Sequence, residues 1–176
     1  MPGHIYLRVG EYEKAIDINE RSQIVDLQFA EIWGDTNFPN IGTYGLSHKA
    51  HAPHALDFVR YANMLQGNYA ESSAAAQRGA DGVGDAAAAV RRGEKRVAHS
   101  WVVDKVFGKY DKLHNAEQSH SGTPYLDGMW SYVKGSAHVA KGHMELAENE
   151  LANVQAQMKA DCLLYTSDAA DDGLSV

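Results

Sequence analysis

Cysteine, proline and long apolar runs are all scarce in this sequence. The single cysteine, Cys162, lies near the C-terminal end, and only four prolines occur among the 176 residues. One thiol cannot form a disulfide framework within the chain. No run of 18 apolar residues occurs, so we expect no membrane-spanning helix. The scarcity of proline and the abundance of alanine together favour helix.

Basic residues are the minority among the charged ones. The chain has 16 lysines and arginines against 23 aspartates and glutamates, a formal charge of −7. An acidic chain without a stripe of lysine and arginine lacks the electrostatic footprint of a nucleic-acid-binding protein. We therefore expect no nucleic-acid partner.

The common catalytic signatures are missing. The sequence has no His-Glu-x-x-His, no Gly-x-Ser-x-Gly and no phosphate loop ending in Gly-Lys-Ser/Thr. The run Gly79-x-x-Gly82-x-Gly84 does not follow a strand, so we interpret it as a loop that breaks the Ala-rich segment. These absences predict that the chain is not an enzyme and has no cofactor.

The last fifteen residues, 162–176, look like translated sequencing adapter. Cys162 to Asp172 matches an in-frame reading of a transposase adapter used in library preparation, and Ser175-Val176 fits the primer sequence that follows it. Three of the acidic residues lie in this tail, so residues 1–161 carry a formal charge of −4. We expect 1–161 to be one helical repeat domain, cut from a longer protein, and 162–176 to be a non-native tail.

One short motif recurs along the chain and predicts helix hairpins. A glycine is followed two positions later by a large apolar or aromatic residue, and the last two glycines are 34 residues apart. Glycine permits the tight turn between two helices, and the large residue begins the second helix. The four copies are Gly10-Glu-Tyr12, Gly67-Asn-Tyr69, Gly108-Lys-Tyr110 and Gly142-His-Met144.

The residue five positions after each glycine is expected to lie where the two helices approach each other. Ala15 and Ala147 suit that position, Ser72 is less usual, and the third copy has Leu113 and a poor first helix. Trp101 and Trp130 are expected in the core. A helical apolar face with intervals of 3, 4, 3 and 4 follows the fourth glycine, at Met144, Ala147, Leu151, Val154 and Met158.

Several segments resemble those of bacterial tetratricopeptide (TPR) repeat proteins, whose repeat is 34 residues long. The resemblance covers most of Met1 to Asp161, and it implies a helical solenoid without a particular activity. The fold class expected is therefore all-α, a TPR-like helix-hairpin solenoid of about four helix pairs. The segments that carry the resemblance are Pro2–Tyr12, Pro53–Phe58 with Met64 and Gly67, Phe107–Tyr110, and Tyr125 onward with Trp130-Ser-Tyr132 and Gly135.

TPR stacks line a concave groove with their first helices, which makes a protein or peptide partner the leading hypothesis. Mixed charge and exposed aromatic rings would suit an extended polypeptide segment. Counted from each glycine, the candidate groove residues are His4, Arg8, His54, Asp57, Tyr61 and Tyr132.

A His-lined metal site in an enzyme or accessory domain is the alternative. His48-x-x-His51-x-x-His54 could present three imidazoles on one helical face, with His4 as a further candidate. Pro53 counts against a continuous face, because proline disfavours helix at the residue before it. A third hypothesis is that the segment is a spacer in a longer chain.

Overall fold

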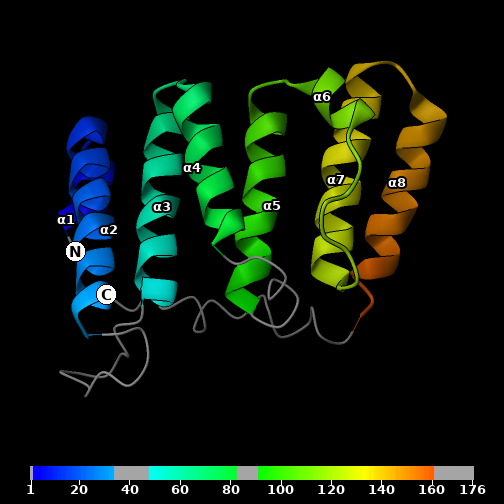
Figure 1. The fold of residues 1–176 in the computed structure, drawn as a ribbon. Coiled ribbons are helices and arrows are strands. Elements are labelled where there is room, and N and C mark those ends of the chain that lie inside the picture. The colour runs from blue at the N-terminus through cyan, green and yellow to red at the C-terminus, as the bar shows by residue number, and fades with distance from the viewer. Residues whose placement is uncertain (1, 34–47, 83–90, 161–176) are drawn as a thin grey trace. The chain divides into compact units, whose positions relative to one another are not determined.

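A computed structural model describes residues 2–33, 48–82 and 91–160, and the only regular secondary structure in these ranges is helical. The chain divides into two compact units, Met1–Ala86 (unit 1) and Ala87–Val176 (unit 2). Figure 1 shows the helices of each unit packed side by side. Unit 1 contains α1 (Pro2–Arg8), α2 (Tyr12–Trp33), α3 (His48–Leu65) and α4 (Tyr69–Asp81), and unit 2 contains α5 (Arg91–Val106), α6 (Tyr110–Asn115), α7 (Pro124–Ala140) and α8 (Met144–Gln157). The all-α prediction is confirmed.

Each recurring glycine forms the turn between two consecutive helices, as the motif predicts. Gly10, Gly67, Gly108 and Gly142 have φ angles of 79°, 75°, 66° and 76°, in the left-handed region. The next helix begins two residues later in every case. The same backbone hydrogen bond also ends the first helix of every pair. The N–H of the residue after the glycine donates to the carbonyl five positions before it, at 2.8–2.9 Å.

The position five residues after each glycine is buried in all four pairs. Ala15 and Ser72 are 0% exposed, Leu113 is 1% exposed and Ala147 is 8% exposed. Ser72 fits because its hydroxyl donates to the carbonyl of Arg60 in the preceding helix, at 3.0 Å. The interhelical contact therefore accepts a polar side chain where that group has a partner.

Two details of the predicted helices are wrong. The first helix of the third pair, α5, is a regular helix of 16 residues, and its second helix, α6, is the short one at six. Gly79 does not break the Ala-rich segment but is buried inside α4, which ends at Asp81. An added Cβ at Gly79 would meet no atom within 4 Å. A glycine lowers helix propensity by about 1 kcal/mol, which the surrounding helix outweighs.

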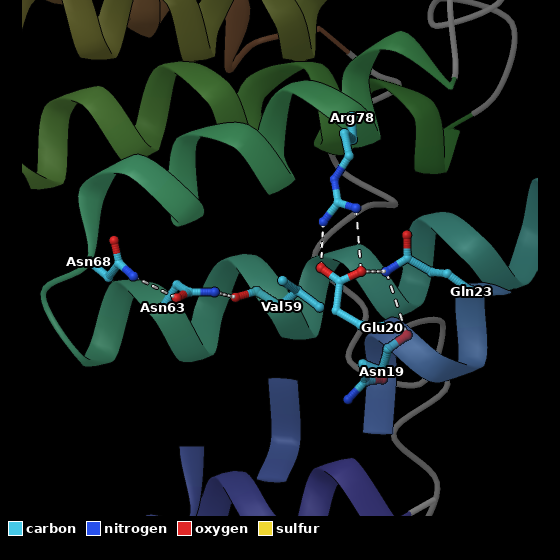
Figure 2. Close-up of polar contacts among 7 residues, drawn as sticks. All are labelled: Asn19, Glu20, Gln23, Val59, Asn63, Asn68 and Arg78. Atoms are coloured by element: carbon cyan, nitrogen blue, oxygen red, sulfur yellow. Dashed lines mark hydrogen bonds and ion pairs between the residues drawn. The ribbon is translucent and has the colours of Figure 1, made fainter. Parts of the chain in front are cut away.

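Unit 1 is held together by an apolar core of α3 and α4 and by polar contacts between side chains. Leu56, Val59 and Ala75 are buried, with Ile16 of α2 packed against them. Figure 2 shows Glu20 of α2 bound by both terminal nitrogens of Arg78 of α4, at 2.6 and 3.3 Å. At the second glycine turn, the Asn68 amide donates to the Asn63 side-chain oxygen at 3.2 Å.

Unit 2 is built around two tryptophans, which the sequence places in the core correctly. Trp101 of α5 and Trp130 of α7 are 6% and 9% exposed, and their rings meet edge to face at 5.1 Å. The start of α7 is fixed by Thr123, whose hydroxyl accepts from the Leu126 backbone N–H.

The apolar face predicted along α8 is mostly exposed. Ala147 is buried, but Met144, Leu151 and Met158 are 55–64% exposed. The helix packs on α7, where Gly135 allows a close approach, because a Cβ at Gly135 would lie 3.1 Å from the Cβ of Glu150. The predicted face thus coincides with the packed side of α8 at Ala147 and Val154, and not at Met144, Leu151 and Met158.

Within the described parts of the chain, no helix combines the length and hydrophobicity that crossing a lipid bilayer requires.

Candidate functional site

The first helices of the two pairs in unit 1 meet through aromatic rings. His4 of α1 packs edge to face on Phe58 of α3, with ring centroids 4.6 Å apart. His54, one turn before Phe58, lies 6.2 Å from His4 and 5.1 Å from Phe58. Two of the residues predicted for the groove, His4 and His54, therefore lie together, because their rings and that of Phe58 meet between α1 and α3.

The other candidate groove residues of unit 1 differ in how far they can reach a partner. Arg8 and Tyr61 are exposed, and Asp57 is half-buried. Asp57 lies close to Arg60, which is 9% exposed. Burial lowers the pKa of the Arg60 guanidinium, and the negative charge of Asp57 opposes that shift. Asp57 therefore has a structural role beside a buried cation, whereas Arg8 and Tyr61 present their side chains to solvent.

Tyr132, the candidate groove residue of unit 2, lies on α7, the first helix of the last pair. It is 44% exposed, and its hydroxyl accepts a hydrogen bond from Lys105 of α5. The same ammonium lies 4.7 Å from the centroid of the Tyr132 ring. Tyr132 thus links α7 to α5 much as His4 links α1 to α3.

The histidine run of the alternative hypothesis falls at the start of α3. Its backbone is helical from His48 onward, so Pro53 does not interrupt the helix. The side chains of His48 and His51 lie outside the part of the chain that the structure describes, and His54 is exposed. Of the three histidines of this run, His54 has a described side chain, and its ring joins the His4–Phe58 cluster.

A second histidine cluster, which the sequence analysis does not name as a site, lies in unit 2. His114, His138 and His143 each offer a ring nitrogen, and these three atoms all lie within 4.8 Å of one another. The ring centroids are 5.2 Å apart for His114–His138 and for His114–His143, and 6.1 Å apart for His138–His143. We call these three residues the histidine triad.

Three helices bring the triad together. His114 lies near the end of α6, His138 lies in the last turn of α7, and His143 is the residue directly before α8. The turn at Gly142 brings His138 and His143 to the same end of the last helix pair. Lys134 of α7 holds the end of α6 in place, because its ammonium donates to the carbonyls of Leu113, His114 and Ala116 at 3.1, 2.8 and 2.8 Å.

The triad combines burial with neighbours of both charge signs. His138 is buried, His114 is half-buried and His143 is exposed. Burial lowers the pKa of the His138 imidazole, and His114 lowers it further, while Glu150 opposes the shift. His138 is therefore held toward its neutral form, in which a ring nitrogen can accept a proton or coordinate a metal ion.

Two ring nitrogens of the triad lack an ordinary partner. Nδ1 of His114 and Nδ1 of His138 are buried and have no hydrogen-bond partner among the described residues. Buried polar atoms of this kind are uncommon in folded proteins, and each calls for an explanation.

The sequence holds only indirect signals for the triad. His143 lies inside the glycine motif, and His138 lies four residues before the glycine of that motif. His114 carries no motif of its own. Only the packing of α6 on α7 shows that it joins the other two.

No family model matches this chain, and neither a curated protein nor a solved structure matches it. Function must therefore be inferred from the helices and side chains themselves.

Proposed function

We propose that this chain is a TPR-type scaffold, a solenoid of helix hairpins that holds an extended segment of a protein or peptide partner along its first helices. A single helix pair cannot bury its own apolar face, so such pairs stack and leave one layer of helices open to a ligand. The proposal makes the chain a binding module rather than an enzyme.

Repetition of the same turn four times supports this architecture. The four glycines share the left-handed backbone, the same terminating hydrogen bond and a buried residue five positions later. A turn repeated at this level of detail is typical of helical repeat proteins, whose stability depends on contacts between neighbouring units.

The observation that carries the proposal is the pairing of first helices within each unit. In unit 1, α1 meets α3 through His4, His54 and Phe58. In unit 2, α5 meets α7 through Trp101 with Trp130 and Lys105 with Tyr132. Adjacent first helices lie side by side in this way in a TPR groove.

The side chains on these paired helices have the chemistry of a peptide-binding surface. Arg8 supplies an exposed cation, and Tyr61 and Tyr132 are 42% and 44% exposed. Arginine and tyrosine are the residue types that most often supply binding energy at protein interfaces. An extended segment with a carboxylate for Arg8 and a side chain that packs on Tyr61 would fit unit 1.

The test is selection from a random 12-residue peptide library on the purified chain, followed by fluorescence anisotropy of the enriched peptides against variants. Arg8→Glu should weaken binding at least tenfold, which corresponds to about 1.4 kcal/mol. Tyr61→Ala should weaken it similarly. Asp57 is a poor test residue, because replacing it also removes the charge next to the buried Arg60.

Arg21→Glu is the matched control, because it makes the same charge change at an exposed position of the second helix α2. It should bind the selected peptides as the unaltered chain does. Equal affinity of all three variants would place the site elsewhere. Failure to enrich any peptide over selection without the protein would remove the proposal.

A further inference from the structure

We propose that His114, His138 and His143 bind one Zn²⁺ ion in unit 2. This inference is independent of the proposed peptide groove, since none of the three residues is among the groove candidates. It also differs from the metal hypothesis that the sequence suggests, which uses His48, His51 and His54.

The spacing of the triad is close to that of zinc ligands. Two nitrogens bound to the same tetrahedral zinc at about 2.0–2.1 Å each lie about 3.3 Å apart. The three nitrogens of the triad already lie within 4.8 Å of one another. Closing the difference requires each imidazole to move by about an ångström, within the range of small side-chain rotations. The most exposed ligand, His143, is the one with the most freedom to do so.

The chemistry of the set favours a borderline-soft ion of this kind. Imidazole suits zinc, copper and nickel, whereas calcium and magnesium prefer oxygen ligands. Coordination through Nδ1 would also give a partner to the two buried Nδ1 atoms of His114 and His138.

Comparison between the helix pairs shows that the fold itself does not need three histidines. In the second pair, the positions of His138 and His143 hold Asn63 and Asn68, which form a hydrogen bond with each other at 3.2 Å. The position of His114, six residues after the third glycine, holds Ile16 after the first glycine, where it packs on the apolar core. An amide pair can thus stand at the turn, and an apolar residue can stand at the position of His114 in the second helix.

Charges of both signs lie near the triad. The Lys134 ammonium donates to three backbone carbonyls at the end of α6, and Lys141 forms an ion pair with Asp111. The Glu150 carboxylate favours positive charge at His138, whereas Lys134 and His143 oppose it. A dication at the triad would therefore have one carboxylate neighbour that attracts it.

Three imidazoles leave one tetrahedral position open on zinc. In three-ligand zinc sites this position holds water or an exchangeable ligand, whereas closed structural sites use four protein ligands. Because His143 is exposed, the open position can face solvent. We infer a site with an exchangeable ligand.

Zn²⁺ titration of the untagged chain by isothermal calorimetry tests this inference. The unaltered chain should bind one Zn²⁺ at the triad, and His143→Gln should weaken that binding at least ~10-fold, the lower end of what loss of even an outer-shell partner costs. His143→Gln should fold normally, since the His143 side chain makes no capping hydrogen bond to α8. His114→Gln should show the same loss.

Two controls locate the ion. His120→Gln makes the same change at another histidine of unit 2, whose ring nitrogen lies 3.2 Å from the hydroxyl of the neighbouring Ser119. The double variant His48→Gln/His51→Gln removes two ligands of the competing set. Both should bind Zn²⁺ as the unaltered chain does. Loss of binding in the double variant with full binding in His143→Gln, or no saturable binding by the unaltered chain, would overturn the proposal.

Discussion

The backbone N–H of His143 donates a 2.9 Å hydrogen bond to the carbonyl of His138, across the turn that Gly142 makes. This bond ends α7 and sets the start of α8, so that two residues five positions apart present their rings at the same end of the helix pair. The architecture of the chain and the geometry of the histidine triad therefore depend on the same turn.

Replacing Gly142 should affect both the stability of unit 2 and the triad. Its φ of 76° is unfavourable for a residue with a Cβ, so Gly142→Ala should lower the free energy of unfolding by about 1–2 kcal/mol. The measurement is urea unfolding followed by tryptophan fluorescence. A Trp33→Phe background restricts the signal to Trp101 and Trp130, both in unit 2.

Gly128→Ala is the control for this prediction. Gly128 lies inside α7, and a Cβ there would be 3.4 Å from the Cβ of Gln157, close to ordinary contact. Because alanine favours helix over glycine by about 1 kcal/mol, this variant should be neutral or slightly more stable. Equal destabilisation by the two variants would mean that the left-handed turn at Gly142 is not the cause.

Lys134→Met should destabilise unit 2. Removing a charge from a half-buried position can by itself stabilise a protein, but here the loss of hydrogen bonds should outweigh that gain. The ammonium is the donor to three carbonyls at the end of α6, and methionine keeps the length of the side chain without the donor. Loss of charge-assisted hydrogen bonds of this kind costs about 1.5–3 kcal/mol. The same urea unfolding experiment measures the loss.

Lys141→Met is the matched comparison, because it also removes a lysine of the same helix pair. Its ion pair is with Asp111, a side chain 86% exposed to water, so its loss should change the stability of unit 2 far less than that of Lys134. If both variants were equally destabilised, the contacts of Lys134 with the end of α6 would have no special importance.

The fold and the triad differ in how much of each a sequence can predict. The turns were predictable, because a left-handed backbone requires glycine and a large residue follows it at a fixed interval. The size of side chain that fits between the helices after each turn was less predictable, since Leu113 is as buried as Ala15. That equality depends on the separation of the helices, which no local pattern encodes.

The triad could not be predicted from spacing, because its members belong to three helices. His114 and His138 are 24 residues apart, and they meet only because α6 packs on α7. The run His48-x-x-His51-x-x-His54 is recognisable from the sequence because its members are close together along the chain. Proximity in sequence favours recognition of local sites, whereas metal ligands commonly come from separate elements.

Exchanging the residues at the interhelical position should show that each pair has its own helix separation. Ala15→Leu should lower the free energy of unfolding of unit 1 by about 1–3 kcal/mol, because Ala15 is fully buried and the larger side chain has no space. Leu113→Ala should lower that of unit 2 by about 2–5 kcal/mol through the cavity it leaves. Circular dichroism during urea unfolding measures both, and tolerance of Leu at position 15 would contradict the close approach of α1 and α2.

Zn²⁺ should stabilise unit 2 specifically. A ligand that binds only the folded state adds about 2.7 kcal/mol at a free concentration of 100 times its Kd. In the Trp33→Phe background, Zn²⁺ should raise the temperature at which the fluorescence of Trp101 and Trp130 changes, and EDTA should reverse the shift. His143→Gln should remove the response, because it deletes one of three ligands without altering a capping bond. A Zn²⁺-dependent shift of the same size in His143→Gln would assign the stabilisation to other residues, since the triad would then have lost a ligand without consequence.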